Sequence, residues 1–340
     1  SWLEPPAHNG VVLGSSPREP TKQGEIMYNL GYACINMQLS YPQEWGDKPR
    51  GVERVTTNRS MIRKTFLEKG LPYASRLSLQ NVTDLETIID WNEKNDIKFY
   101  RMSSDVFPWA SEYNLEELPD FDEIEATLAR CGEKARSYGQ RLTTHPGPFN
   151  KLTSPREHVV RNTITDLETH GRLFDLLGAP RTPYAKINIH VGAHYNDRQM
   201  ALGNFCNNYE KLSEAVRSRL TVENDDKASL YSTKELYDEV YSRIGIPIVF
   251  DYHHHKFCDG GQDEEEALLT ACMTWGDVKP VVHYSQSRSI EQNDPKIRAN
   301  AHSDSYWTPI NLYNLDLDVM LECKHKEIGL YKMRELMETA

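Results

Sequence analysis

The sequence predicts an α/β protein, a TIM-type (β/α)8 barrel with an extended N-terminal arm. Short apolar segments alternate with longer amphipathic ones, which is typical of βαβ units and a parallel sheet. The chain has 340 residues, a length compatible with one such domain. A polar side chain also stands at or just beyond the carboxyl end of each predicted strand, where barrel enzymes build their active sites.

The N-terminal arm is predicted over residues 1–25, and the barrel domain over residues 26–340. The arm contains Pro5, Pro6, Pro17 and Pro20 together with glycines and serines, and it shows no sustained apolar period. This composition favours extended chain over helix or strand. A long loop is expected after the first strand, over Tyr41–Val55.

Eight segments are predicted to form the strands of the barrel. They are Leu30–Ile35, Lys98–Met102, Arg141–Thr144, Lys186–Ile189, Leu220–Val222, Ile246–Phe250, Val278–Val282 and Asp318–Leu321. The helices between them are predicted from apolar spacing, and the first has Thr83 and Glu86 in a capping-box spacing. The predicted helices are Val82–Asn92, Phe121–Tyr138, His158–Leu177, Gln199–Ser218, Thr233–Arg243 and Glu264–Thr274.

Composition limits the compartment and the partners. Six cysteines are widely separated and form no CxxC pair, which favours a reducing, intracellular compartment. No apolar run approaches the roughly 18 residues that suggest a membrane span, so no membrane partner is expected. The net charge of −11 opposes binding to nucleic acid, unless bound divalent cations and a local basic rim offset it.

The polar residues at the strand ends predict a metal site. They are Asn36, Ser103, His145, His190, Glu223, Asp251, His283 and Glu322. A single histidine after a strand is more often a structural hydrogen-bonding residue, but histidines and carboxylates that arrive together at one barrel face favour Mn, Fe or Zn. The remaining histidines, His8, His158, His170, His194 and His325, are expected at the surface.

Two segments carry most of this hypothesis. Asp251 and His254 have a spacing that lets them bind neighbouring ions, although the triple histidine 253–255 could also be a surface feature. Glu223 follows a strand directly and could bridge two ions about 3.5–4 Å apart; the alternative is a plain acidic turn over residues 223–226. Such a cluster suits phosphoryl chemistry, but sugar isomerases use similar residues. No GxxxxGK[ST], GxGxxG or GxSxG motif is present, so no nucleotide cofactor is expected.

Several motifs, in order over residues 30 to 330, resemble the UV damage endonuclease family, which is related to endonuclease IV and to the xylose isomerase-like barrels. They are Gly31–Asn36, Thr57–Arg59, Arg101–Ser104, Phe107–Ser111, His145–Gly147, Glu223–Asp225, Asp251–His255, His283–Ser285, Ala301–Asp304 and Glu322–Lys324.

The resemblance implies a DNA repair endonuclease that cuts damaged double-stranded DNA immediately 5′ of a pyrimidine dimer or another distorting lesion. It implies two to three divalent ions, Mn2+ first and Mg2+ or Zn2+ as alternatives, and hydrolysis by a metal-bound hydroxide. We expect a monomer in the nucleus or mitochondrion of a eukaryote, or otherwise in the cytoplasm. The rivals are an abasic-site endonuclease, a damage-binding protein with weakened catalysis, and a sugar isomerase.

The resemblance also implies roles for individual residues. One ion would be held by His145, His190 and Glu223; a second by Glu223, Asp251, His283 and Glu322; and a third would involve His254 and His302. Glu223, His145 and His283 are the expected catalytic residues. Tyr32 and Asn36 are expected near the damaged bases and backbone.

Three positions depart from the family pattern. Pro148 and Phe149 stand where the family usually has glutamine and an aromatic residue that wedge into the duplex, and Phe149 can still stack there. Glu112 replaces a common histidine, and Val281 replaces a lysine near the metals. Nearby Lys279 should point differently on a regular strand. Glu112, Pro148 and Phe149 are expected to contact DNA at the lesion.

Overall fold

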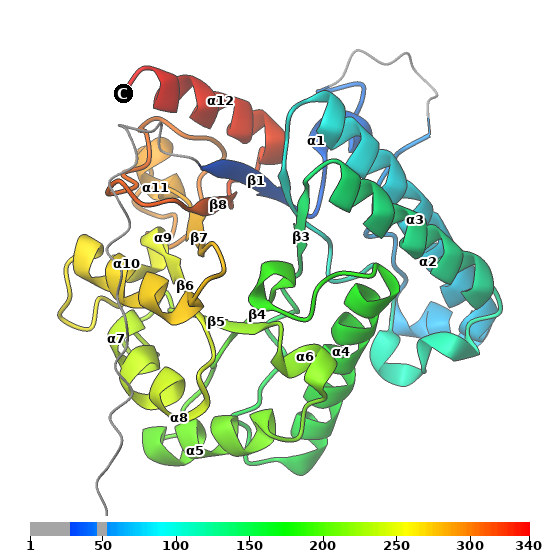
Figure 1. Ribbon diagram of the computed structural model, residues 1–340, viewed down its shortest axis with the longest axis horizontal. Helices are drawn as coiled ribbons and strands as arrows, with labels where there is room; N and C mark the ends of the chain where they lie inside the picture. The colour runs from blue at the N-terminus through cyan, green and yellow to red at the C-terminus, as the bar shows by residue number, and fades with distance from the viewer. Residues whose placement is uncertain (1–27, 46–52) are drawn as a thin grey trace, which may run out of the picture.

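The structure is a computed structural model that describes residues 28–45 and 53–340. The predicted arm, residues 1–25, lies outside the described residues, as do His8 and part of the loop expected over Tyr41–Val55. The described residues form a parallel barrel with helices packed around it (Figure 1), so the predicted fold class is confirmed.

All eight predicted strands are present, with ends within three residues of those expected. The strands are β1 Asn29–Ala33, β2 Phe99–Arg101, β3 Arg141–Thr143, β4 Ile187–His190, β5 Leu220–Glu223, β6 Ile248–Asp251, β7 Val281–Tyr284 and β8 Asp318–Leu321. They pair in the order β3-β2-β1-β8-β7-β6-β5-β4. Between the outermost strands, β3 and β4, the described residues have only an isolated bridge, Thr144 to Ile187. We call this place the seam of the barrel.

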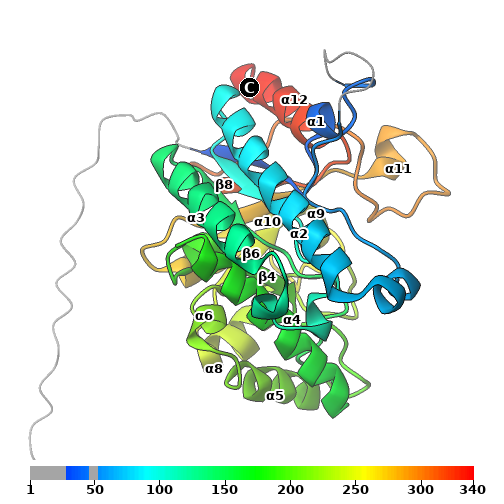
Figure 2. The ribbon, with the colours of Figure 1, turned by 90° about the vertical axis from the view of Figure 1, so that its right-hand side faces the viewer.

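Helices connect the strands and surround them. The α-helices are α1 Met37–Ser40, α2 Arg63–Lys94, α3 Phe121–Ser137, α4 Glu157–Leu176, α5 Arg198–Tyr209, α6 Glu214–Arg217, α7 Thr233–Leu236, α8 Ser242–Ile244, α9 Tyr252–His255, α10 Glu264–Cys272, α11 Arg288–Glu291 and α12 Lys326–Glu338. A π-helical turn, Tyr237–Tyr241, joins α7 to α8, and 3-10 turns cover Ala110–Glu112, Leu115–Glu117, Pro183–Ala185 and Met273–Trp275. Figure 2 shows α2 and α3 side by side, and α11 standing out from the barrel.

Two predicted helices were wrong in extent. The helix predicted over Val82–Asn92 is the second half of α2, which begins at Arg63 and contains a kink at Gly70, where φ is +60. Gly70 and the nearby Pro72 interrupt the apolar pattern, so the first turns of α2 could not be predicted from apolar spacing. The helix predicted over Gln199–Ser218 is two helices, α5 and α6, separated by residues 210–213. The other four match within about two residues.

The barrel has a large apolar cluster, a smaller one formed by Ala33, Phe99, Val249, Trp275, Val281 and Met320, and buried ionic groups. Arg141 begins β3 and Asp318 begins β8, and their side chains form a buried ion pair of 2.9 Å at the amino end of the barrel. Lys279, which precedes β7, joins this group through Asp318 Oδ1, at 3.1 Å. The amino end is therefore filled, and the carboxyl end is left for a site.

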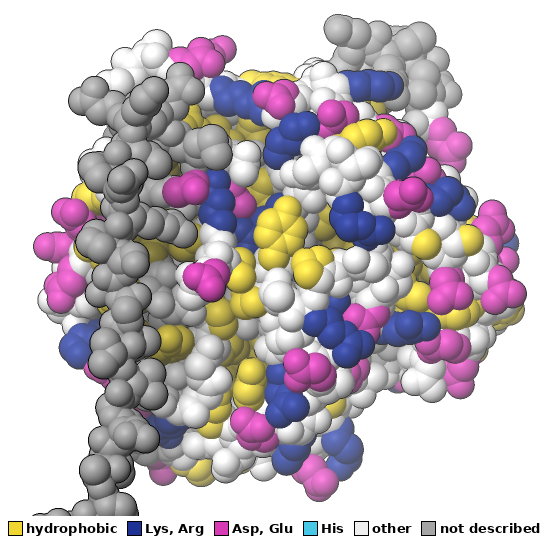
Figure 3. Space-filling model, in the orientation of Figure 1, with side chains coloured by type: hydrophobic (Ala, Val, Ile, Leu, Met, Phe, Trp, Pro, Cys, Tyr) yellow, Lys and Arg dark blue, Asp and Glu magenta, His cyan; other side chains and the backbone are white. Residues whose placement is uncertain are grey.

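The surface carries no single dominant charge on the face seen in Figure 3, where acidic, basic and apolar side chains are interspersed. Within the described residues, no helix combines the length and apolarity that a membrane crossing requires.

Candidate metal centre

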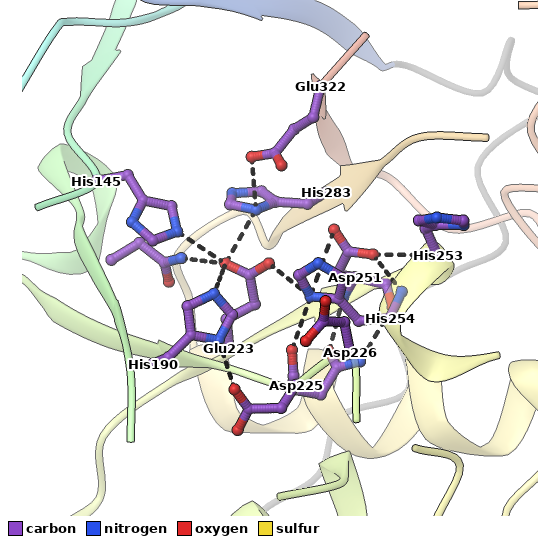
Figure 4. A network of polar contacts seen from close by, with 12 residues as sticks. His145, His190, Glu223, Asp225, Asp226, Asp251, His253, His254, His283 and Glu322 are labelled. Atoms are coloured by element: carbon purple, nitrogen blue, oxygen red, sulfur yellow. Dashed lines mark hydrogen bonds and ion pairs between the residues drawn. The ribbon is translucent and has the colours of Figure 1, made fainter. Parts of the chain in front are cut away.

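Strand ends place the candidate ligands around one point (Figure 4). His190, Glu223 and Asp251 are the last residues of β4, β5 and β6. His283 lies in β7, Glu322 follows β8, and His145 comes two residues after β3. Because parallel strands of a barrel converge at their carboxyl ends, residues up to 177 positions apart in the sequence meet there.

Glu223 is the hub of this cluster and is 1% exposed. Its Oε2 lies 3.2 Å from His145 Nε2 and 3.1 Å from His283 Nδ1. The other oxygen, Oε1, lies 3.3 Å from His254 Nδ1. Burial alone would raise the pKa of Glu223, but the surrounding imidazoles, His283 first, lower that pKa well below its ordinary value. The carboxylate is therefore ionised and available to cations.

Three groups of side chains could each hold a metal ion. In each group the ligand atoms lie within 4.8 Å of one another, and the groups are His145, Glu223 and His283; His190, Glu223 and His254; and Asp251, His283 and Glu322. Glu223 and His283 each belong to two groups. The two oxygens of Glu223 can bridge adjacent ions, whereas His283 faces both of its groups with the same atom, Nδ1, and can bind one ion at a time. Imidazole with carboxylate is the donor set of Mn2+, Fe2+ and Zn2+ sites.

The hydrogen bonding of the two carboxylate oxygens of Asp251 favours a metal-binding role for this residue. Oδ1 accepts the backbone N–H groups of His253 and His254, both at 2.7 Å, because Asp251 caps the short helix α9. Oδ2 is buried and accepts no hydrogen bond from the described residues. Burial raises the pKa of Asp251 to about 6. A buried carboxylate oxygen without a partner is costly, and a bound cation would remove that cost.

Three other side chains orient the ligand candidates, and their roles were not predicted from the sequence. His190 Nδ1 lies 3.1 Å from Asp225 Oδ1, the carboxylate–histidine arrangement that fixes an imidazole toward a metal. Asn188 Nδ2 donates to Glu223 Oε2 at 2.5 Å. Arg101 forms a buried ion pair with Glu322.

Lys186 is a further neighbour of the cluster. Its Nζ lies 3.0 Å from His283 Nε2, and burial, followed by the charge of Arg101, lowers the pKa of Lys186 to about 7. Val281, the position where a lysine was considered from the family pattern, is fully buried and apolar. The two-residue period of a strand predicts that Lys186, Asn188 and His190 share one face. Lys186 could therefore have been predicted from the sequence to lie on the same side as the ligand candidate His190.

His302 stands apart from the compact groups. Its Nδ1 lies 3.1 Å from the backbone oxygen of Glu322 and 3.7 Å from Glu322 Oε2. His302 belongs to none of the three donor groups found among the described residues. His254 and His302, the pair expected for a third ion, have ring centroids 6.0 Å apart. Among the described residues, His254 therefore shares a donor group with His190 and Glu223, whereas His302 shares none.

The predicted DNA-contacting residues differ in accessibility. Tyr32 and Asn36 are fully buried: Tyr32 Oη donates to Asn92 Oδ1 at 2.8 Å, and Asn36 Nδ2 donates to Tyr32 Oη at 3.0 Å. Asn36 also caps α1 by accepting the Leu39 N–H. Enclosed in this way, neither side chain presents a surface to DNA. Phe149, by contrast, is 63% exposed.

Two cavities open beside the cluster. The first, about 720 Å³, is lined by metal-ligand candidates from both sides of the seam and by Pro148. The second, about 440 Å³, is lined by Phe149, Trp109, Arg63 and Glu112. Glu112 pairs with Arg63 at 2.8 Å. Gly147 lines both cavities, so Pro148 and Phe149 stand at the boundary between them.

Of the described histidines expected at the surface, His158 is exposed and His194 and His325 are partly exposed, and one needs a correction. His170 was expected at the surface, but in α4 it is only 5% exposed, and its Nε2 lies 3.9 Å from Asp166 Oδ2. Burial lowers the pKa of His170, so it packs as a neutral core residue.

Comparisons with known proteins agree with the geometry. The family model "UV-endonuclease UvdE" matches residues 28–340. A UV-damage endonuclease of Schizosaccharomyces pombe is 32% identical over 89% of this chain and 50% of its own length, and one of Neurospora crassa is 31% identical over 91% and 51%. This chain thus spans about half the length of those fungal relatives. A UV DNA damage endonuclease of Bacillus cereus is 32% identical over 91% of this chain and 94% of its own length.

Solved structures show the same fold. The crystal structure of SacUVDE superposes with a TM-score of 0.75 and 29% identity, covering 92% of this chain and 98% of that one. A D-tagatose 3-epimerase-like protein, with a TM-score of 0.50 and 13% identity, shares the barrel fold alone.

Proposed function

The chain belongs to the UV-endonuclease UvdE family, and from that premise we propose that it is a metal-dependent DNA endonuclease. It would hydrolyse the backbone of damaged double-stranded DNA 5′ of UV photoproducts. The observation that carries the proposal is the ligand cluster around Glu223, in which one buried carboxylate faces four imidazoles. Such a cluster at the carboxyl end of a barrel suits phosphodiester hydrolysis.

The residues present fit a pair of divalent cations, Mn2+ first. As the family resemblance implies, His145, His190 and Glu223 would hold one, and Glu223, Asp251, His283 and Glu322 the other. The donor groups among the described residues combine these side chains differently, with His145 beside Glu223 and His283, and His190 beside Glu223 and His254. When bound, such ions activate water and neutralise charge on the phosphate. Asp251 Oδ2 and the deprotonated Glu223 are the donors that the structure leaves available.

The chain's own residues would position the strand around that centre. Arg101 shares the cavity with Glu322 and His145 and can donate to a phosphate oxygen as well as to Glu322. Phe149 is exposed at the boundary of the two cavities, where it could fill the gap that a displaced base leaves in the duplex. Tyr32 and Asn36 would act indirectly, by holding the turn that follows β1.

The test is an incision assay on an end-labelled duplex with one cyclobutane pyrimidine dimer, run with Mn2+, Mg2+, Zn2+ or EDTA. A metal-dependent cut immediately 5′ of the dimer is expected from the wild type, and Glu223→Gln should abolish it. Glu327→Gln is the control, because Glu327 is also buried but binds the backbone N–H groups of Met37 and Gln38. Retained binding without a cut would favour a damage-binding protein, and cutting only an abasic duplex would favour an abasic-site endonuclease.

A further inference from the structure

A lysine lies beside the metal-ligand candidates, in space that a glycine leaves open. Lys151 is half-buried in the wall of the 720 Å³ cavity. Its chain lies across Gly192, where a Cβ atom would come within 2.9 Å of Lys151 Cδ and 3.0 Å of Nζ. Gly192 has a φ of +95, which L side chains rarely adopt, and it follows the ligand candidate His190 by two residues. The backbone at position 192 therefore makes room for this lysine.

A second lysine lines the same cavity. Lys227 is exposed in the turn after β5, four residues beyond Glu223. Among the described residues, neither lysine ammonium has a hydrogen-bond acceptor or an ion-pair partner within bonding distance. Burial lowers the pKa of Lys151 and the charge of Lys227 adds to that lowering, while Asp225 opposes it from a distance. The two cations thus repel each other, and neither forms an ion pair with a carboxylate of the described residues.

These two lysines differ in pairing from the third cationic side chain of the cavity. Arg101, which also lines it, is paired with Glu322. The chain carries a net charge of −11, and the cavity is also lined by Glu223, Asp225, Asp226 and Glu322, yet the two ammonium groups are left able to bind an added anion. In protein–DNA interfaces, lysines of this kind position the duplex through its phosphates.

We infer that Lys151 and Lys227 form a phosphate subsite that holds the backbone phosphate next to the one at the metal centre. The inference rests on the proposed function, since it assigns the second phosphate to the same DNA strand.

Salt dependence tests this subsite directly. We would measure kcat and KM for incision of the dimer-containing duplex, with Mn2+, between 50 and 200 mM salt, for wild type, Lys151→Gln and Lys227→Gln. Loss of one phosphate contact makes the slope of log affinity against log salt shallower by about 0.9, so the deficit of each variant should shrink about 3.5-fold over this range. KM should rise and kcat should stay near the wild-type value. Lys94→Gln is the control, because Lys94 is exposed at the end of α2, which leads into the amino end of β2.

Stopped-flow fluorescence anisotropy of the same duplex measures binding before the strand is cut. If the wild type binds but does not cut, the proposed function fails while the slopes of the binding constants still test the lysines. Slopes equal to wild type in both variants would overturn the inference. A fall in kcat with unchanged KM would also overturn the inference, because it would indicate that the lysines act in the chemical step at the metal centre and not in binding DNA. A slope change in Lys94→Gln as large as in the other variants would overturn it as well.

Discussion

Replacing Glu223 by glutamine should remove half or more of the thermal stabilisation that divalent cations give this protein. Glutamine keeps the size of the side chain and can still accept the hydrogen bond from Asn188, but it lacks the negative charge. Glu223 belongs to two of the three donor groups. The substitution therefore weakens two cation sites at once, while Asp251, His283 and Glu322 keep their own group.

The size of the effect follows from mass action. A cation present at about 100 times its dissociation constant stabilises the folded state by about 2.7 kcal/mol. A folded domain of about 300 residues has an unfolding entropy near 0.6 kcal/mol/K. Each bound ion should therefore raise Tm by about 4 °C, and two ions by about 8 °C.

The assay is differential scanning fluorimetry of EDTA-stripped protein titrated with Mn2+ at constant pH and ionic strength. The wild type should show the full shift, and Glu223→Gln about half of it or less. Glu327→Gln serves as the matched control, because it removes another buried carboxylate whose partners are backbone N–H groups. Its Tm without metal can differ from wild type, but its Mn2+ shift should be unchanged.

Two results would refute this reasoning. The first is a wild-type protein whose Tm does not respond to Mn2+, Mg2+ or Zn2+, since the cluster would then hold no cation. The second is a Glu223→Gln variant with the full shift, since Glu223 would then not be the bridging ligand.

Three further predictions follow from single side chains. Asp225→Asn should weaken metal binding by about 10- to 100-fold without unfolding the protein, because Asp225 orients His190; isothermal titration with Mn2+ checks this, and unchanged affinity would contradict it. Phe149→Ala should weaken binding to the dimer-containing duplex by about 5- to 100-fold through lost stacking, with Phe149→Tyr close to wild type in anisotropy titrations. Burial raises the pKa of Glu327 from 4.5 to about 7, so the folded state binds this proton more tightly than the unfolded state, and stability should fall by roughly 3 kcal/mol as pH rises from about 4.5 to 7. Urea unfolding across this range should show that fall in wild type and a flatter profile in Glu327→Gln.

The sequence predicted the barrel because the barrel's pattern is local. Each strand is a short apolar run that ends in a polar residue. Because all strands of a parallel barrel end on the same face, these polar residues can be placed together even when the order of strand pairing is not known. For that reason, the residues proposed as ligands could be named from their positions alone. The start of α2 could not be, because Gly70 and Pro72 break the period on which helix prediction depends.

What the sequence missed depends on contacts between distant segments. Tyr32 is enclosed because Asn92, 60 residues away, accepts its hydroxyl hydrogen, and nothing near Tyr32 in the sequence indicates that partner. The exposure of Phe149 and the unpaired ammonium of Lys151 are likewise properties of the folded surface. Lys186 is the exception, since strand periodicity alone would have put it on the same face as His190.

The seam between β3 and β4 gives the metal centre a second consequence. His145 follows β3 and His190 ends β4, and their ring centroids are 5.5 Å apart across the seam. A cation held jointly by both imidazoles and Glu223 would cross-link β3 to β4 at the seam, where the ladder of backbone hydrogen bonds is interrupted. The amides of β3 and β4 should then exchange with deuterium more slowly in the loaded protein than in the stripped one. Under the proposed function, the cavity wall at the seam would therefore be rigid only in the metal-loaded protein.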